Sequence, residues 1–344
     1  VRIGIGLFTG QLPADSTQTF AESYRETLEL VRLAEALGFD SAWVSEHHGA
    51  SDGYFPSLLV MLAAFAEATN HIRLGTGVIL TPFHDPLRLA EDIATVDQLS
   101  GGRLTVGLGL GWREEEFRMF GQPVGERLAR TRETVEVLRL AAGGQRFSFH
   151  GSMFAYDGVR VTPPTAQTPG APIILGGYTD AALHRAGAIG DGHITDADDP
   201  DHIHHAVSLM EEGAREAGKD PAALHLVLMQ NAWVAEPGAD PWAQIRGGVI
   251  HQLGMYEAWE ADHDTPEHDS AEPSVADEST ARMSVAGGTA EEVILRLRPI
   301  VEEFGRRANF DLVVRLHYPG MAFDDAARAV ERFGESVIPA LKGN

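Results

Sequence analysis

The sequence contains no cysteine, which excludes disulfides, thiolate zinc sites and cysteine nucleophiles together. It also lacks any apolar run close to the roughly 18 residues that span a bilayer. The opening VRIGIGLF has neither the basic flank nor the cleavage site of a secretory signal. We therefore expect a cytoplasmic protein that does not enter membranes.

Basic residues are scarce as well. The 344 residues include 27 lysines and arginines against 50 aspartates and glutamates, which gives a formal net charge of -23. That charge would repel nucleic acid and anionic lipid surfaces, so neither is expected as a partner. With 44% hydrophobic residues the chain can bury a large core. A small molecule is the expected ligand.

Short apolar runs alternate along the chain with longer segments of helical period, which is typical of repeated strand and helix units. Strands are predicted over 2–8, 40–45, 72–79, 104–110, 172–175, 192–195, 224–234 and 310–316. Helices are predicted over 23–37, 57–69, 86–99, 127–142, 180–189, 200–217, 290–304 and 324–341. Eight such units favour a closed parallel (β/α)8 TIM barrel in a single domain, 1–344, over an open doubly wound sheet.

Two segments do not fit the repeat. Residues 147–161, FSFHGSMFAYDGVRV, alternate in polarity and predict a small hairpin. Residues 247–281 contain no lysine or arginine, and nine acidic residues lie from Glu257 to Glu278. We expect a long acidic loop there, before the last unit. It is either a lid over the strand ends or a solvated linker.

The stretch SEHHGASDGYFP follows the second predicted strand. Active sites of parallel barrels lie at the carboxyl ends of the strands, so Glu46, His47 and His48 are candidates for one. A histidine beside a carboxylate can hold or release a proton. A metal is the competing use, but adjacent histidines at a strand end point to opposite faces, and few others follow strands: His193 and His317. No metal is therefore expected.

Three other histidines lie close together near a predicted helix start. We interpret them as solvated surface residues rather than ligands: His202, His204 and His205.

Three blocks of the sequence resemble the bacterial luciferase-like monooxygenase superfamily. They are GFDSAWVSEHH, then IRLGTGVILTPFHDPLRLAEDIATVDQLSGGRLTVGLGLGWREEEFRMFG, then PIILGGYTDAALHRAGAIGDGHI, in the family's order across 38–194. The ending DLVVRLHYPGMAFDDAARAVERFGESVIPAL resembles the family's closing unit. The resemblance implies a barrel that binds reduced flavin mononucleotide (FMN) or a related deazaflavin coenzyme, without a metal. In the FMN branch, a separate flavin reductase usually supplies the reduced flavin, and molecular oxygen is the co-substrate.

The third block suits a flavin phosphate. A predicted strand ends there at Gly177 and a helix begins near Asp180, so free backbone N–H groups would face an anion. By resemblance, Tyr178, Thr179 and Ala182 occupy the family's phosphate positions, and Gly177 permits close backbone approach. The alternative is an ordinary strand-to-helix turn that needs glycine for its dihedral angles.

The second block carries the residues expected near the flavin ring. The resemblance implies a cis peptide bond between Gly77 and Val78 beneath the ring. We interpret the glycines of GLGLGW, 107–112, as thinning the barrel wall for the ring rather than as a dinucleotide motif. Leu110 stands where luciferase itself has an arginine that contacts the phosphate. Arg113 either supplies this charge or pairs with the glutamates 114–116.

By resemblance, His47 is the catalytic histidine, a general acid and base. Glu46 is expected to orient that imidazole or nearby backbone. The motif ATVDQLSGGR is also typical of the family, but we expect Asp97 and Arg103 within it to bind each other or helix-end carbonyls and so to be structural.

The function that these residues predict is an FMN-dependent monooxygenase that oxygenates a mainly apolar small organic substrate. Two alternatives stay open: a deazaflavin-dependent oxidoreductase that transfers hydride, and a flavin-binding barrel without catalysis. The segment SLLVMLAAFAEAT, from Ser57, is apolar on more than one face. It predicts a homodimer interface, unless a neighbouring helix of the same chain covers it.

Overall fold

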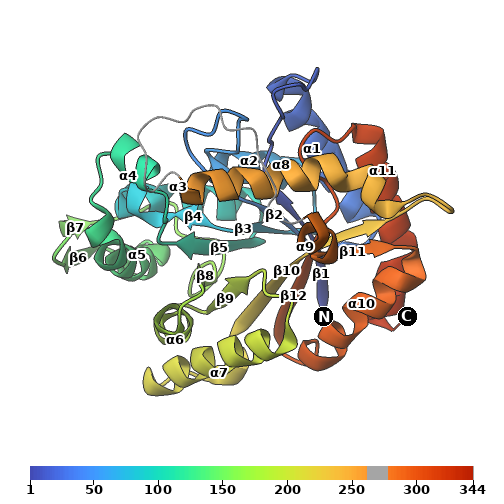
Figure 1. Ribbon diagram of the computed structural model, residues 1–344. Helices are drawn as coiled ribbons and strands as arrows, with labels where there is room; N and C mark the ends of the chain where they lie inside the picture. The colour runs from blue at the N-terminus through green and yellow to red at the C-terminus, as the bar shows by residue number, and fades with distance from the viewer. Residues whose placement is uncertain (262–277, 344) are drawn as a thin grey trace.

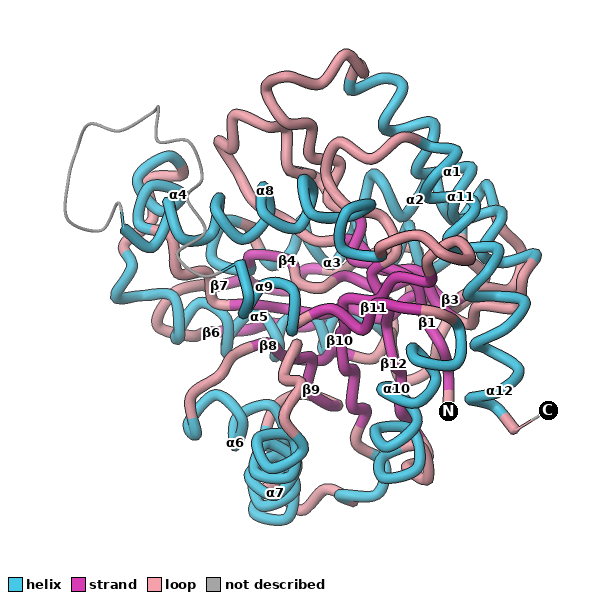
Figure 2. The backbone as a smooth tube through the Cα atoms, turned by 45° about the vertical axis from the view of Figure 1, so that its right-hand side comes forward, coloured by secondary structure: helices cyan, strands magenta, loops and turns pink. Residues whose placement is uncertain are grey.

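Eight parallel strands form a closed ring in the structure of the protein, a computed structural model that describes residues 1–261 and 278–343 (Figures 1 and 2). In barrel order they are β1 (Arg2–Phe8), β2 (Ser41–Val44), β3 (Arg73–Thr76), β5 (Leu104–Gly109), β8 (Ile173–Gly176), β9 (Gly192–Thr195), β10 (His225–Val234) and β12 (Asn309–Arg315). The ring closes where β12 pairs with β1. The predicted TIM barrel is confirmed, and the open doubly wound sheet is excluded.

Helices surround the ring and follow the predicted order (Figure 2). They are α1 (Phe20–Ala36), α2 (Leu58–Ala68), α3 (Pro86–Leu99), α5 (Arg127–Ala142), α6 (Asp180–Ala188), α7 (Pro200–Glu216), α10 (Ala290–Phe304) and α11 (Phe323–Arg332). Side chains fix several starts: Thr19 and Thr289 each form a reciprocal capping box with the glutamate three residues on. The last predicted helix, 324–341, is instead α11, a π-helical turn (Phe333–Val337) and α12 (Ile338–Lys342).

Two short strands extend the sheet beyond the ring. β4 (Ile79–Leu80) continues the line of β3 and pairs with β5. β11 (Val285–Gly288), which was not predicted, pairs with the second half of β10, from Asn231 opposite Val285. The predicted hairpin is confirmed as the antiparallel pair β6 (Phe147–His150) and β7 (Ala155–Val159).

The prediction of a loop over residues 247–281 was wrong at both ends of that range. Residues up to 261 belong to helix α8 (Pro241–Ala261), which crosses the face of the barrel in Figure 1, and 278–281 begin helix α9 (Glu278–Met283). The helix forms because its apolar side chains are buried: Trp242, Ile245, Val249 and Trp259 are at most 7% exposed. Residues 262–277, and with them the remaining prediction of a lid or linker, lie outside the described residues.

The interior of the barrel is built in layers by the two-residue alternation of its strands. Its middle layer is apolar and comprises Trp43, Ile174, Ile194, Val227 and Val313. Glycines make room for the large indole of Trp43, because a Cβ on Gly75 would lie 2.2 Å from this ring. The layer separates the two ends of the barrel.

The amino end of the barrel is closed by a paired charge. Asp311 accepts hydrogen bonds from Arg2 Nε at 2.9 Å and Ser41 Oγ at 3.0 Å, and pairs with His225. Burial alone would raise the pKa of Asp311, but the contacts from His225 and Arg2 outweigh it and lower this pKa to about 2. A cleft of about 770 Å³ opens at this end between α3, α5 and the barrel floor, with Arg73 in its lining.

Helix α2 is covered largely by its own chain, since α1 and α3 pack against it. In this fully described helix, Val60 is the one large hydrophobic side chain that is exposed, at 68%. The homodimer therefore stays a prediction. None of the helices in the described ranges combines the length and the apolar character that a membrane crossing requires.

Candidate active site

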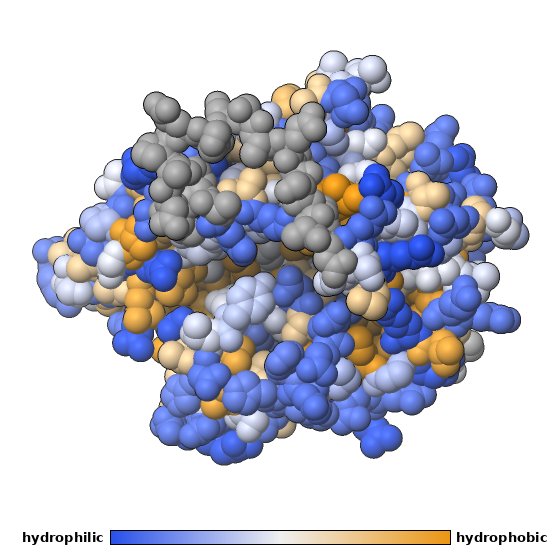
Figure 3. Space-filling view, viewed as in Figure 1, coloured by the Kyte–Doolittle hydropathy of each residue, from blue (hydrophilic) through white to orange (hydrophobic). Residues whose placement is uncertain are grey.

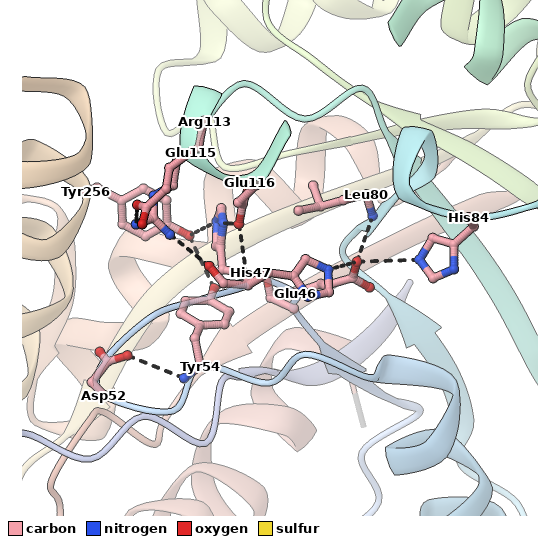
Figure 4. A network of polar contacts seen from close by, with 12 residues as sticks. Glu46, His47, Asp52, Tyr54, Leu80, His84, Arg113, Glu115, Glu116 and Tyr256 are labelled. Carbon is pink, nitrogen blue, oxygen red and sulfur yellow. Dashed lines mark hydrogen bonds and ion pairs between the residues drawn. The ribbon is translucent and has the colours of Figure 1, made fainter. Parts of the chain in front are cut away.

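His47 lies at the carboxyl end of the barrel, where the chain leaves β2, and is 5% exposed. Its Nδ1 is 2.9 Å from Oε1 of Glu116, a buried residue of helix α4 (Glu114–Met119) (Figure 4). The same oxygen accepts the backbone N–H of His48 at 2.8 Å. Because this oxygen is an acceptor, Nδ1 carries the proton and Nε2 is left as the basic nitrogen.

A chain of hydroxyl groups leads to that basic nitrogen. The hydroxyl of Tyr256, from α8, lies 3.3 Å from His47 Nε2 and 3.2 Å from the hydroxyl of Tyr54. Tyr54 in turn donates to Ser45 Oγ at 3.0 Å. Burial raises the pKa of both tyrosines, so each keeps its proton near neutral pH. The arrangement can pass a proton along hydrogen bonds to or from His47.

Aromatic rings enclose the imidazole of His47 on several sides. The ring centroids of Trp259, Tyr54, Tyr256 and Trp112 lie 4.7, 4.8, 5.5 and 6.3 Å from that of His47. Two of these residues come from α8. The helix therefore forms part of the site, and it shields His47 from water.

Arg113 holds the indole of Trp259 in place. Its guanidinium lies 4.6 Å from the ring centroid, donates to the backbone oxygen of His48 at 2.8 Å and pairs with Glu115. Of the two predicted uses for Arg113, pairing with the neighbouring glutamates is thus the one present. This pair lies in the site rather than on the surface, since Arg113 is 7% exposed.

Glu46 belongs to a separate network, and of the two roles predicted for it, orienting the imidazole of His47 or nearby backbone, the structure shows the second. Its Oε1 accepts from His48 Nε2 at 2.9 Å and from the backbone N–H of Leu80 at 3.3 Å, and it lies 3.6 Å from His84 Nε2 (Figure 4). Burial would raise the pKa of Glu46, but the two histidines outweigh it and lower this pKa. The expected contact with nearby backbone is present, and the role of orienting His47 falls to Glu116.

Helix α8 is tied to the loops after β1 and β2 by buried polar contacts. His251 Nε2 lies 2.9 Å from Oδ2 of Asp52, and the same oxygen accepts from Gln11 Nε2 at 2.6 Å. These contacts fix the position from which Tyr256 reaches His47.

The predicted phosphate residues lie together at the start of α6. Thr179 is the N-cap, and its hydroxyl accepts from the backbone N–H of Ala182 at 3.3 Å. Gly177 has φ +140°, and a Cβ there would lie 2.8 Å from that of Ala182. Tyr178 is 72% exposed and donates to Asp196 at 3.0 Å. The free N–H groups at this helix end fit a phosphate.

The predicted cis peptide bond between Gly77 and Val78 is confirmed, and a second one, between Gly6 and Leu7, was not predicted. The glycines 107 and 109 have a different role from the one predicted. A Cβ on Gly107 would lie 2.0 Å from the Thr76 oxygen, and one on Gly109 would lie 2.5 Å from Val78 Cγ2. The two glycines allow Thr76 and Val78 to pack closely against β5, and they do not leave free space for a ring.

Leu110 follows β5 and is half-buried. The face of the molecule drawn in Figure 3 is hollowed beneath α8, and hydrophobic surface lies within the hollow. The free N–H groups at the start of α6 fit the phosphate of a flavin, and the apolar hollow at the same mouth fits its ring. The fit rests on Gly177 and the first turn of α6 for the phosphate, and on Val78 for the ring.

The remaining sequence candidates lie outside this site or are structural. Arg103 donates to the carbonyls of Ala66 and Thr69 at the end of α2, as predicted. Asp97 instead accepts from Gln167, a partner that was not predicted. The surface histidines 202, 204 and 205 pair with exposed carboxylates. In the described part of the chain, no group of three or more histidine, aspartate or glutamate side chains is placed to hold a metal ion.

His193 lies in the wall of the barrel, away from the mouth. It is 1% exposed, and its Nδ1 donates to the Leu175 oxygen at 2.8 Å. Burial lowers the pKa of His193 to about 4, so it is neutral near pH 7.

The carboxyl end of this closed parallel barrel thus combines a buried histidine paired with a carboxylate and a helix start whose N–H groups fit a phosphate, an arrangement typical of barrel enzymes. The chain belongs to the luciferase-like monooxygenase family, whose model matches residues 1–308.

Known relatives include both a monooxygenase and a reductase. Monooxygenase RslO1 from Streptomyces bottropensis shares 28% identity and a TM-score of 0.82, over 98% of this chain and 99% of that one. A 5,10-methylenetetrahydromethanopterin reductase from Archaeoglobus fulgidus is 28% identical over 340 residues, 93% of this chain and 96% of the relative. An F420-dependent secondary alcohol dehydrogenase, at 22% identity and a TM-score of 0.77 over 99% of this chain and 98% of that one, shows the fold alone.

Sequence reasoning missed several residues of the site: Glu116, Tyr256, Trp259 and Trp112. Glu116 was concealed in the acidic run REEEF, although the buried Phe117 beside it marks the inward face of α4. Tyr256 and Trp259 lie in the segment predicted as a loop. Their aromatic character was the available signal.

Proposed function

We propose that the protein is a flavin-dependent monooxygenase that uses reduced FMN and molecular oxygen to oxygenate a small organic substrate. The observation that carries the choice of FMN is the charge around the start of α6. Asp196 accepts from Tyr178, and Asp180 pairs with His205, so acidic groups flank the phosphate position. FMN carries one phosphate, whereas F420 adds a chain of glutamates that these carboxylates would repel.

Bound reduced FMN would supply the electrons that activate oxygen. Gly177, Thr179 and the first turn of α6 would hold its phosphate, and Val78 would contact its ring. The residues of the chain would transfer protons and exclude water. Glu116 fixes the proton of His47 on Nδ1, which leaves Nε2 free to take up a proton and return it. Tyr256 connects Nε2 to Tyr54, and the aromatic rings of α8 exclude water from the mouth.

The second candidate is hydride transfer with the deazaflavin coenzyme F420. Its support is the reductase from Archaeoglobus fulgidus, which matches this chain over nearly its full length, together with the F420-dependent alcohol dehydrogenase that shares the fold. A flavin-binding protein without catalysis is a third possibility. The intact relay from Ser45 to Glu116 argues against it, because a protein that only binds flavin needs no buried proton path.

The test is an anaerobic titration of the protein with reduced FMN and, separately, with reduced F420, followed by admission of oxygen. We expect reduced FMN to bind at least about tenfold more tightly, as acidic neighbours disfavour the more anionic coenzyme. Tighter binding of reduced F420 would replace the proposal with the second candidate. FMN binding without turnover of any substrate in a panel of apolar compounds would favour the third. A separate flavin reductase is the proposed source of reduced FMN.

A further inference from the structure

Arg315 lies inside the barrel at its carboxyl end. It is the last residue of β12, on which Asp311 and Val313 both face the interior: Asp311 contacts Ser41 and His225, and Val313 belongs to the apolar middle layer. Successive side chains of a strand alternate between faces, so Arg315 continues the inward row above Val313. Its side chain is 7% exposed.

The guanidinium of Arg315 lacks a partner within the described residues. Its Nη1 is buried without any hydrogen bond, and no carboxylate lies within ion-pair distance of it in residues 1–261 and 278–343. Arg113, buried to the same degree, has a carbonyl, a carboxylate and an indole. A buried cation without a counter-charge is unfavourable for folding. Its presence therefore points to a ligand that supplies the missing anion.

The surroundings of Arg315 place it in the same mouth as His47. Its positive charge acts on Tyr54 and Tyr256, both part of the relay, and opposes the rise that burial causes in their pKa. It also acts on His317, two residues on. Burial, and then the charge of Arg315, lower the pKa of His317 to about 4, so His317 is neutral near pH 7.

We propose that Arg315 binds an anionic oxygen of the substrate, so that the substrate is an aromatic or otherwise planar acid with an apolar body. This inference rests on the proposed function and narrows its substrate class. Arginine holds carboxylates and similar anions through paired N–H donors. Tyr54 and Tyr256 offer hydroxyls near the same group. The rings of Trp112 and Trp259 suit a flat apolar body next to His47.

The position of Arg315 separates this role from binding of the flavin phosphate. The phosphate residues follow β8, whereas Arg315 ends β12, with β9 and β10 between them in the ring. An anion at Arg315 would thus occupy a part of the mouth separate from the start of α6. The substrate would lie between this anchor and the flavin, with its apolar part toward His47.

The test measures binding of a charged probe and its neutral analogue, 2-naphthoate and 2-naphthamide, by calorimetry in the presence of oxidised FMN. Arg315→Gln removes the charge, Arg315→Lys keeps it, and Arg73→Gln is the matched control. Arg73 is an inward-facing arginine at the opposite end of the barrel, which donates to Thr105. Circular dichroism and thermal melts verify that each variant is folded.

We expect the wild-type protein to bind 2-naphthoate at least about tenfold more tightly than 2-naphthamide. Arg315→Gln should remove this preference by weakening 2-naphthoate alone, Arg315→Lys should keep part of it, and Arg73→Gln should keep all of it. Equal binding of the two probes to the wild type, including no binding of either, would overturn the proposal. So would an unchanged preference in Arg315→Gln.

The FMN titration separates the two proposals. If Arg315→Gln weakens FMN rather than 2-naphthoate, Arg315 contacts the cofactor, and the substrate assignment is wrong. If FMN does not bind while 2-naphthoate binds through Arg315, the flavin function fails and the anion site stands. If FMN binds and supports oxygen uptake without any charge preference among the probes, the function stands and the anion site fails.

Discussion

Strand β12 carries two buried charges of opposite sign and opposite surroundings. Asp311, at the amino end, contacts Arg2, Ser41 and His225, whereas Arg315, at the carboxyl end, has a buried nitrogen without a partner. Both side chains face the barrel interior, separated by the apolar layer that includes Val313. The strand thus supplies stability at one end and an unsatisfied group at the other.

The same contrast extends beyond one strand. Eight residues in the part of the chain that the structure describes hold a buried side-chain atom without a hydrogen bond, and four of them lie at the carboxyl end: Gln11, His84, Glu116 and Arg315. Buried polar groups are normally satisfied, and each exception calls for an explanation such as a catalytic role or a bound water or ion. The amino end closes the barrel, and the carboxyl end is shaped for cofactor and substrate.

The largest expected effect comes from removing the ion pairs of Asp311 at the amino end of the barrel. Asp311→Ala would leave Arg2 and His225 facing an empty buried position, and we expect the free energy of unfolding to fall by about 3–5 kcal/mol. Urea denaturation measures this. Asp157→Ala, which removes an exposed partner of His150, is the control and should change stability by less than about 1 kcal/mol. Similar losses for both variants would contradict a special role for the amino end.

The next effect concerns the chemistry of the mouth. His47→Ala should lower turnover about 100-fold or more, because it removes the proton carrier, while FMN affinity changes little. His48→Ala is the matched control: this neighbour contacts Glu46 instead, and we expect turnover to fall less than about tenfold. Steady-state kinetics with an oxygen electrode provide the measurement. Equal turnover of the His47 variant and the wild type would exclude His47 as the catalytic group.

The pH dependence of the free energy of unfolding tests the ion pairs of Asp311 in the wild-type protein. The pKa of Asp311 is about 2 in the folded state, below the reference value of 3.8, so its ionised form stabilises the fold. This contribution is complete above pH 3.8 and is lost as the pH falls toward 2. It amounts to about 2 kcal/mol. Asp311→Asn should lack this part of the acid dependence. An identical acid profile in that variant would show that Asp311 is not the group responsible.

A smaller effect is expected when only the partner of His47 changes. Glu116→Gln keeps the side-chain volume but removes the charge opposite Nδ1, and we expect kcat to fall about tenfold with KM within about twofold. The shape of the pH–rate profile should change as well, since the proton relay loses its terminal carboxylate. Glu114→Gln, an exposed neighbour on α4, should match the wild type in both. A normal pH–rate profile in Glu116→Gln would leave Glu116 with a structural role alone.

The fold was largely predictable from the sequence because alternating strands and amphipathic helices leave a clear local pattern. The predicted ranges 2–8, 86–99, 127–142, 192–195 and 290–304 agree with the structure at both ends. β11 was missed because VAGG is short and rich in glycine. It is a strand because β10 is long enough to offer its second half as a pairing edge. Local composition does not encode that circumstance.

The candidate site was only partly predictable. His47 follows a predicted strand, and the resemblance to a family identified it. The residues that orient and enclose it come from distant segments. Glu116 lies in an acidic run, and Tyr256 and Trp259 lie in the segment 247–281, which was predicted to be a loop because of its acidic composition. Most of the acidic residues that led to the loop prediction come after residue 261, where α8 ends. Contacts between segments that lie far apart in sequence are set by packing, which no single-segment pattern reveals.

The most direct test of the contrast between the two ends is the urea unfolding of Arg315→Met, with and without 2-naphthoate. Without ligand, we predict that the variant is at least as stable as the wild type, because methionine removes a buried unpaired charge while filling similar space. With 2-naphthoate, only the wild type should gain stability. A variant less stable than the wild type by more than about 1 kcal/mol, with equal stabilisation of both by 2-naphthoate, would show that Arg315 is an ordinary structural residue.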